Sequence, residues 1–416
     1  MLLNIRWNPA KTPRPGHYRK SPICRADIDP VHATNRGDAM KRRQFLTLLT
    51  ATGLLSGCTG NEIRRSLASA QQLSNGDVPS ALSAQIPSTG VAPLDQLVRK
   101  QLKSMIQELA KIWGDEKVAT PKEYVKYTDQ YKSRAIVNFN TGRIRVETVD
   151  EKKPDAALKA AIISTLLTPE NPSKVDLLSD KAVKTGQTPF LYDLVVDQDK
   201  KPVGTQWRAN RYAEYLMKHA YHVDTYNGKK RRYVTFDMIQ DHNQAQQKHY
   251  ASYVNRQSKR FGIDSALIYA IIETESSFNP YAMSHIPAYG LMQIVPQSAG
   301  RDAYRFLYKK DGTPTKDYLF KAGNNIEMGT VYLHILFTRY LSNVKNAKAR
   351  EYCCIAAYNT GSGNVLNAFD SNRDRAFSKI NAMSASAVYS HLRKNLKYEE
   401  ARNYLYKVTQ KKRAYV

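Results

Sequence analysis

The hydrophobic and polar positions of this chain recur with two different periods. Apolar residues between positions 93 and 113 lie three or four residues apart, which predicts an amphipathic helix that ends at Gly114. Around Asn140-Thr141-Gly142 the period becomes two, and a turn of this type between alternating residues predicts a β-hairpin over residues 133–150. The first part of the chain therefore mixes helix and strand.

The same mixture continues to about residue 245. The pattern predicts a helix over residues 155–167 and strands over residues 190–196 and 233–236. Helices and strands that do not alternate regularly are typical of the α+β class. We therefore predict an α+β domain over residues 93–245, in which we find no catalytic constellation.

From residue 246 onward the pattern is almost entirely helical. Short apolar-periodic segments are separated by clusters of Gly and Pro, which favours a compact all-α domain over residues 246–416. The expected helices cover residues 247–261, 265–277, 296–307, 326–343, 349–358, 361–369, 385–395 and 398–407.

The segment before these domains carries an export pattern. Lys41-Arg42-Arg43 is charged, residues 45–55 are apolar, and Leu55-Ser56-Gly57-Cys58 places small residues before a cysteine. This order resembles the signal peptide of a bacterial lipoprotein, and the apolar stretch is too short to span a bilayer as a helix. Thr59 follows the cysteine, and in the lipoproteins that this pattern resembles, a residue other than Asp there accompanies sorting to the outer membrane.

This pattern divides the N-terminal part of the chain. We predict a signal peptide over residues 40–57 and lipidation of Cys58, which would anchor the protein in the outer membrane facing the periplasm. Residues 1–39 are polar and contain several prolines, so we expect translation to start at Met40. Residues 58–92 are rich in Ser, Ala, Gln, Gly and Pro, which is typical of a flexible tether.

The charge of the chain limits its partners. The 416 residues include 63 Lys and Arg against 37 Asp and Glu, a net charge of +26, which suits a polyanionic partner or surface. The densest basic runs, residues 229–232 and 411–413, are too short to predict nucleic-acid binding. Anionic lipid, an acidic cell wall, or a generally basic surface without a specific partner remain. No oligomeric state is predicted.

Cysteine usage suggests neither a metal nor a disulfide. Cys353 and Cys354 are adjacent within an apolar run, and neighbouring cysteines rarely form a disulfide. Because the sequence has no CxxC motif or histidine cluster, we predict no metal and no cofactor, and expect both cysteines to be small buried hydrophobic residues.

Two glutamates in the stretch ETESSFNP, at residues 273–280, are candidates for acid–base chemistry. In the helix expected here, Leu267, Ile271 and Glu275 are four residues apart and share one face, while Glu273 lies about 200° around the helix from Glu275. If the two apolar residues face the core, Glu275 lies at its rim, where partial burial raises the pKa of a carboxyl group. A raised pKa suits a general acid. The alternative is a solvated side chain at a helix end.

Four further motifs follow in a fixed order. They are Gly290-Leu291-Met292-Gln293-Ile294, then Asn325-Ile326 with Gly329 and Tyr332-Leu333, then the run from Ala356 to Val365, and finally Glu400, Arg402 and Tyr404. With Glu275-Ser276, Phe278 and Pro280, their order and spacing over residues 246–416 resemble the soluble lytic transglycosylase family. The resemblance implies a helical domain with a goose-lysozyme-like fold. It also implies that Glu275, the Glu directly before Ser, is catalytic.

The resemblance further implies a reaction that uses one carboxyl group. Glu275 would protonate the β-1,4 glycosidic oxygen between N-acetylmuramic acid and N-acetylglucosamine in peptidoglycan. It would then take the proton of the muramic C6 hydroxyl, leaving a 1,6-anhydro end without water. The residues implied to bind substrate are Ser284, Met292, Gln293, Tyr358, Asn359 and Tyr404, and Tyr404 is also suited to hold the carboxyl group of Glu275.

Two other functions remain open from the sequence. One is a muramidase that admits water and yields reducing ends, which needs a second carboxylate. The other is a lipoprotein that binds the cell wall without turnover, against which the intact motif around Glu275 argues. The masses of the products separate the first of these from a transglycosylase.

Overall fold

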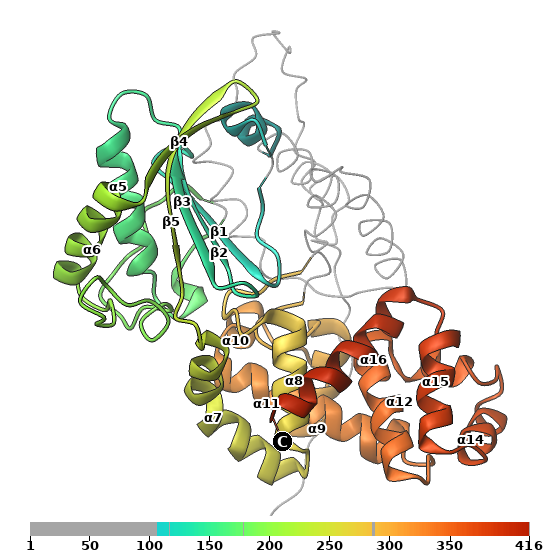
Figure 1. The fold of residues 1–416 in the computed structure, drawn as a ribbon. Coiled ribbons are helices and arrows are strands. Elements are labelled where there is room, and N and C mark those ends of the chain that lie inside the picture. The colour runs from blue at the N-terminus through green and yellow to red at the C-terminus, as the bar shows by residue number, and fades with distance from the viewer. Residues whose placement is uncertain (1–105, 116, 178, 285–287, 416) are drawn as a thin grey trace, which may run out of the picture.

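The computed structural model describes residues 106–415 except 116, 178 and 285–287. The predicted signal peptide, Cys58 and the tether lie outside the described residues, as does most of the helix predicted from residue 93. Two parts follow one another along the chain: a sheet with flanking helices, and then an assembly of helices (Figure 1). In the described part of the chain, no helix has the length and apolar character needed to cross a membrane.

The first part is built on a five-stranded antiparallel sheet with the order β1-β2-β3-β5-β4. The predicted hairpin forms β2 and β3, and Gly142 in the connection has a φ of 74°, a conformation that favours glycine. The strands are β1 Glu123–Thr128, β2 Ser133–Asn138, β3 Arg143–Thr148, β4 Tyr221–Tyr226 and β5 Lys229–Asp237.

Both faces of this sheet are covered. The helices α5 (Pro154–Leu166) and α6 (Gln206–His219) pack side by side on one face (Figure 1). On the other face, Trp113 from the helical residues 106–113 packs with Val125 and Tyr127 of β1. Because β1 is buried on both sides, its burial pattern is continuous and lacks the alternation that reveals a strand in sequence.

The structure confirms an α+β first part and corrects one element. The predicted hairpin, the helix over residues 155–167 and the strand over residues 233–236 are all present. The strand predicted over residues 190–196 is wrong, because this segment forms turns in which the N–H groups of Leu194 and Val195 both donate to the carbonyl of Leu191. The side chains of Leu194 and Val195 are buried. A short apolar run predicts a strand, but here the run forms turns whose side chains fill the core.

The second part is all-α, as predicted. All eight expected helices are present, although their ends differ and two of them include a π-helical segment, η2 Pro296–Gly300 and η3 Leu336–Tyr340. The α-helices are α7 His242–Phe261, α8 Ser265–Ser276, α9 Arg301–Tyr308, α10 Lys316–Leu319, α11 Ala322–Ile335, α12 Ala347–Thr360, α13 Ser362–Asn367, α14 Arg373–Asn381, α15 Ala385–Asn395 and α16 Glu399–Lys412. Cys353 and Cys354 are buried and free in α12, as expected.

The two parts dock through the segment that directly follows α8. Tyr281 is 1% exposed and inserts between Tyr124 and Phe190 of the first part, with ring centroids 5.0 and 5.4 Å away. Its hydroxyl donates to the carbonyl of Pro169. Asn279 Nδ2 donates to the carbonyl of Pro121 at 3.0 Å. The sheet is therefore fixed against the chain a few residues beyond Glu275.

Candidate active site

Helix α8 places Glu275 in its last turn, at the centre of the helical part. Asp264 caps the start of the helix by accepting a hydrogen bond from the N–H of Ala266 at 2.9 Å. Helix α8 packs between α7 and α16 (Figure 1). Leu267 and Ile271 are fully enclosed, as the sequence predicts for the face that carries Glu275.

The end of α8 is unusually sharp. Ser277 and Phe278 both adopt positive φ angles, 49° and 63°, which is costly for residues other than glycine. Phe278 is completely buried and stacks on Tyr250 at 6.3 Å between centroids, and this packing offsets the backbone cost. The turn leaves Glu275 at the edge of the core and directs the chain toward the sheet.

The carboxyl group of Glu275 is half-buried and is held by one phenol. Tyr404 of α16 donates its hydroxyl hydrogen to Glu275 Oε1 at 2.8 Å. Burial raises the pKa of Glu275 to about 8; the hydrogen bond from Tyr404 and the charge of Lys122 oppose this shift, while the charge of Glu400 adds to it. At neutral pH the carboxyl group is therefore mostly protonated and can act as an acid.

Glu273 is in a different environment although it is only two residues away. Its carboxylate accepts hydrogen bonds from Lys411, with which it forms an ion pair, and from the hydroxyl of Tyr415 at 2.9 Å. These contacts tie α8 to the C-terminal end of the chain. Glu273 thus has a structural role. The sequence contains only an indirect sign of this role, because Glu273 lies outside the motif that begins at Glu275.

The Gly290–Ile294 motif forms a loop that is tied to α8, α11 and α12. Ser276 Oγ lies 2.8 Å from the carbonyl oxygen of Leu291, and Tyr358 donates its hydroxyl hydrogen to the carbonyl of Met292 at 2.9 Å. The buried Asn325 accepts from the N–H of Met292 at 2.7 Å and donates to the carbonyl of Tyr289 at 2.7 Å. The four sequence motifs therefore meet around the end of α8.

Gly290 is required at its place in this loop. Its φ is 74°, and a Cβ there would lie 2.4 Å from Asn325 Nδ2 and 2.7 Å from the carbonyl oxygen of Leu319. A side chain would therefore meet both backbone strain and a clash with the amide that braces the loop.

Four of the expected substrate-binding residues lie at or near this region. Tyr358 is half-buried; burial raises the pKa of its phenol, and the charge of Glu275 adds to this shift. Asn359 directs its Nδ2 toward Glu400 Oε1 at 3.3 Å, and Gln293 folds its Nε2 back onto the carbonyl of Gly290 at 2.9 Å. Ser284 is half-buried next to the undescribed residues 285–287, and its N–H donates to the carbonyl of Ala288.

Met292 requires a correction. Its side chain is 0% exposed and lies against Gly329, where an added Cβ would come within 2.4 Å of its sulfur. The expected apolar wall for substrate is therefore a core residue here, because the close approach of α11 at Gly329 makes room for it beneath the loop. What reaches outward is its carbonyl, which Tyr358 binds.

Sequence reasoning missed two contributors to this site. Lys122 lies in the first part of the chain, far from Glu275 in sequence, and no motif marks it. Glu400 belongs to a motif that was noted, but its charge on Glu275 and its contact with Asn359 needed the fold. The spacing of residues 400 and 404 on α16 was the available signal, because residues four apart share a helix face.

Five other acidic residues of the helical part are engaged elsewhere. They bind partners away from Glu275: Asp264 and Glu351 with Lys412, Asp302 with Tyr340, Asp311 with Arg301, and Glu327 with Arg260. Over the described residues, no group of three or more His, Cys, Asp or Glu side chains is placed to hold a metal ion.

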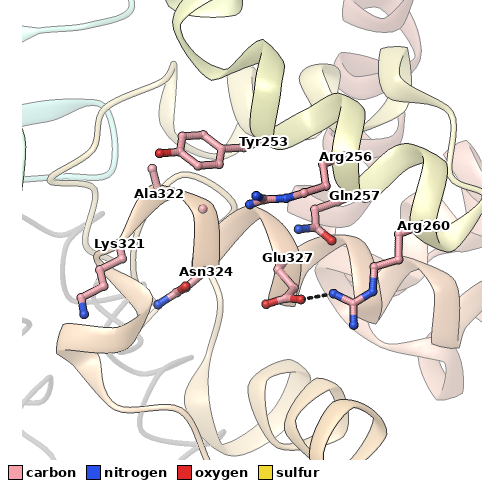
Figure 2. Close-up of a pocket in the computed structure, with 9 residues that line it drawn as sticks. Tyr253, Arg256, Gln257, Arg260, Lys321, Ala322, Asn324 and Glu327 are labelled. Carbon is pink, nitrogen blue, oxygen red and sulfur yellow. Dashed lines mark hydrogen bonds and ion pairs between the residues drawn. The ribbon is translucent and has the colours of Figure 1, made fainter.

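A separate hollow of about 500 Å³ lies between α7 and α11 (Figure 2). It is lined by polar and basic side chains, among which Arg260 is paired with Glu327 at 2.5 Å. Neither Glu275 nor any of the residues expected to bind substrate lines it. We therefore place the candidate active site at the end of α8, where the protonated carboxyl group lies, and not in this hollow.

Both parts of the chain match known protein families. Residues 91–249 match the N-terminal domain of membrane-bound lytic murein transglycosylase C, and residues 252–381 match the transglycosylase SLT domain. The proteins named membrane-bound lytic murein transglycosylase C from Cronobacter sakazakii and Salmonella typhimurium are each 43% identical over 308 residues, covering 73% of this chain and 85% of theirs. This chain belongs to the membrane-bound lytic murein transglycosylase C family. It is therefore an enzyme of the lytic transglycosylase type.

Solved structures of lytic transglycosylases resemble part of the chain. An inactive mutant of the lytic transglycosylase Slt from Pseudomonas aeruginosa is 24% identical, with a TM-score of 0.30 over 40% of this chain and 24% of that one. The 70 kDa soluble lytic transglycosylase from Escherichia coli is 26% identical, with a TM-score of 0.32 over the same shares. The junction of the two family matches, between residues 249 and 252, falls inside α7 of this transglycosylase.

Proposed function

We propose that this lytic transglycosylase cleaves the β-1,4 bond between N-acetylmuramic acid and N-acetylglucosamine in peptidoglycan and leaves 1,6-anhydromuramic ends. Glu275 serves as the acid and then as the base. The observation that carries the proposal is the half-buried carboxyl group of Glu275, whose pKa is raised to about 8 and which one phenol orients. The pKa of Glu275 is raised, whereas the pKa values of five aspartates in the described part of the chain are lowered. These are Asp115, Asp150, Asp197, Asp311 and Asp370.

In the first step, protonated Glu275 gives its proton to the glycosidic oxygen as the bond from that oxygen to the muramic C1 breaks. The carboxylate left behind is stabilised by the hydrogen bond that Tyr404 donates to it. The N-acetylglucosamine departs with a new hydroxyl group, and positive charge develops at C1.

In the second step, the carboxylate of Glu275 takes the proton of the muramic C6 hydroxyl, and the C6 oxygen bonds to C1. Glu275 is again protonated, so the cycle closes without water. Because the nucleophile belongs to the sugar, the protein supplies one carboxyl group and needs no second one. Tyr358, Asn359, Gln293 and Ser284 offer hydrogen bonds to the substrate, and Met292 supports the loop from beneath.

The test of this function compares Glu275→Gln with Glu273→Gln. Loss of the acid should lower turnover of purified sacculi by at least about a hundredfold, while binding to sacculi and folding are retained. Glu273→Gln breaks the ion pair with Lys411 and should keep most of the activity. If Glu273→Gln is the inactive variant, the assignment to Glu275 is wrong.

The products decide between this reaction and hydrolysis. A transglycosylase releases anhydromuropeptides that are lighter by one water than the products of a muramidase. A muramidase would need a base to activate water, and Glu400, whose charge acts on Glu275, is the candidate. Ordinary reducing ends from the wild-type enzyme would establish hydrolysis, and a protein that binds sacculi without any product would be a non-catalytic binder.

We also propose that the protein is a lipoprotein of the outer membrane that faces the periplasm. The support is the signal-peptide pattern over residues 40–57 followed by Cys58 and Thr59. A lipid anchor at the end of a tether of residues 58–92 would keep the enzyme near its substrate.

A further inference from the structure

One face of α16 lies over the end of α8 and carries four polar side chains. Glu400, Tyr404, Lys407 and Lys411 follow one another at intervals of three or four residues, so they share this face. Tyr404 binds Glu275 and Lys411 binds Glu273. Lys407 lies between these two contacts in sequence, so it projects from the same face.

Lys122 reaches the same place from the first part of the chain. The carbonyl of the preceding Pro121 accepts the hydrogen bond of Asn279, four residues beyond Glu275, and the carbonyl of Lys122 accepts from the N–H of Phe139 at 3.0 Å. Its backbone is thus fixed on both sides at the docking contact. Burial lowers the pKa of the Lys122 ammonium group, and so do the charges of Lys411 and Lys407, while Glu273 and Glu275 act in the opposite sense.

Two of the three lysines at this point have no ion-pair partner among the described residues. Among the described residues Lys411 is paired with Glu273, whereas neither Lys122 nor Lys407 has a carboxylate within ion-pair distance. Because Glu275 is mostly protonated at neutral pH, it does not supply the missing charge. Exposed lysines without partners are common, but Lys122 is half-buried, and grouping it with two other cations costs free energy unless a ligand brings an anion.

We propose that Lys122, Lys407 and Lys411 form a lysine subsite beside Glu275 that binds a carboxylate carried by the glycan strand. This inference rests on the proposed function, since it assumes that the strand lies across Glu275. In peptidoglycan such a carboxylate belongs either to the lactyl group of a muramic residue without peptide or to the peptide attached to that residue. The first part of the chain thereby contributes to substrate selection through Lys122.

The experiment measures binding by calorimetry in the inactive Glu275→Gln protein, with and without Lys122→Met. The ligands are glycan strands that carry peptides, strands stripped of peptides so that the lactyl carboxylates are free, and a neutral β-1,4-linked N-acetylglucosamine oligosaccharide. Lys122→Met should weaken binding of at least one acidic strand by about tenfold and leave the neutral oligosaccharide unchanged. The strand that is weakened identifies the source of the carboxylate.

A matched control is Lys159→Met. Like Lys122, Lys159 belongs to the first part of the chain. It lies on α5, one of the helices that cover the sheet, and forms an ion pair with Glu214. It should change binding of none of the three ligands. Lys407→Met, an exposed change on α16, should reproduce the selectivity of Lys122→Met even if the latter disturbs docking. Equal weakening for all three ligands in both variants, or no weakening in either, overturns the proposal.

Failure of the subsite and failure of the proposed function are separable. The reaction is judged from the products that the wild-type enzyme releases from sacculi. The subsite is judged from the binding of acidic against neutral ligands when no cleavage occurs. The wild-type enzyme could release anhydro products while Lys122→Met changes the binding of acidic and neutral ligands alike. That pair of results would overturn the lysine subsite and leave the proposed function standing.

Discussion

At the scale of single residues, two glutamates in one helical turn have opposite chemistry because their surroundings differ. Glu273 accepts from Lys411 and Tyr415, so its negative charge is balanced. Burial at the edge of the core raises the pKa of Glu275 and favours its protonated form, although the hydrogen bond that Tyr404 donates opposes this shift. The distinction follows from which side of α8 each carboxyl group faces.

Tyr404→Phe should move the pH dependence of cleavage in a defined direction. Activity requires the protonated form of Glu275, so the wild-type rate should fall as pH rises through about 8. The Tyr404 hydroxyl stabilises the carboxylate form, so its removal should raise the pKa of Glu275 further and shift this fall to higher pH. The maximal rate should drop about tenfold, because the carboxyl group loses its orienting hydrogen bond.

The measurement is the pH profile of anhydromuropeptide release by both proteins. Tyr406→Phe is the matched control: it removes a phenol from the same helix, but Tyr406 is 48% exposed. A fall at unchanged or lower pH in Tyr404→Phe would show that its hydroxyl does not bear on the ionisation of Glu275.

At the scale of elements, the site is the meeting of one helix end and one loop. The loop over residues 290–294 is held by the side chains of Ser276, Asn325 and Tyr358, each from a different helix. Motifs that are separated along the chain therefore meet at this loop. Each of the three helices supplies one anchor, and Gly290 and Gly329 allow the close approach of neighbouring side chains.

Gly290→Ala should destabilise this arrangement. A Cβ at Gly290 combines positive φ with a 2.4 Å contact to Asn325, so we expect a loss of about 1–3 kcal/mol in the free energy of unfolding. Gly363→Ala is the matched control, since nothing lies within 4 Å of a Cβ there and α13 favours alanine. Urea unfolding of both variants measures the difference, and equal stability would contradict the role given to Gly290.

At the scale of the whole molecule, the two parts are joined by more than the chain. Tyr281 belongs to the core of the sheet part although it follows α8, and Asn279 bonds to the loop that carries Lys122. The position of the sheet is therefore coupled to the end of α8. The net charge of +26 suits the acidic cell wall and the anionic membrane surface beside which we propose that the protein works.

Cys58→Ala should release the protein from membranes. Lipidation at Cys58 is the anchor proposed for the chain, and the substitution removes the sulfur to which lipid would be attached. Fractionation of cells by centrifugation, with immunoblotting of soluble and membrane fractions, measures the change. Ser56→Ala, which keeps a small residue before the cysteine, is the control expected to stay in the membrane fraction. Continued membrane association of Cys58→Ala would contradict lipid anchoring.

The sequence by itself determined the two kinds of domain and the helices of the second one, and it predicts Glu275 rather than Glu273 as the acid. These depend on period, spacing and local order, which are written along the chain. The sequence did not predict the structure of residues 190–196, because their apolar side chains fill the core from a turn. It did not reveal β1 either, because burial on both faces removes the alternation that marks a strand.

Only the tertiary structure decided what surrounds the carboxyl group. Met292 is a core residue rather than a wall because α11 approaches closely at Gly329. Tyr404, Glu400 and Lys122 act on Glu275 from other elements, and Lys122 does so from the other part of the chain. Burial and charge at a site depend on distances through space between residues far apart in sequence, and those distances are set only when the elements pack.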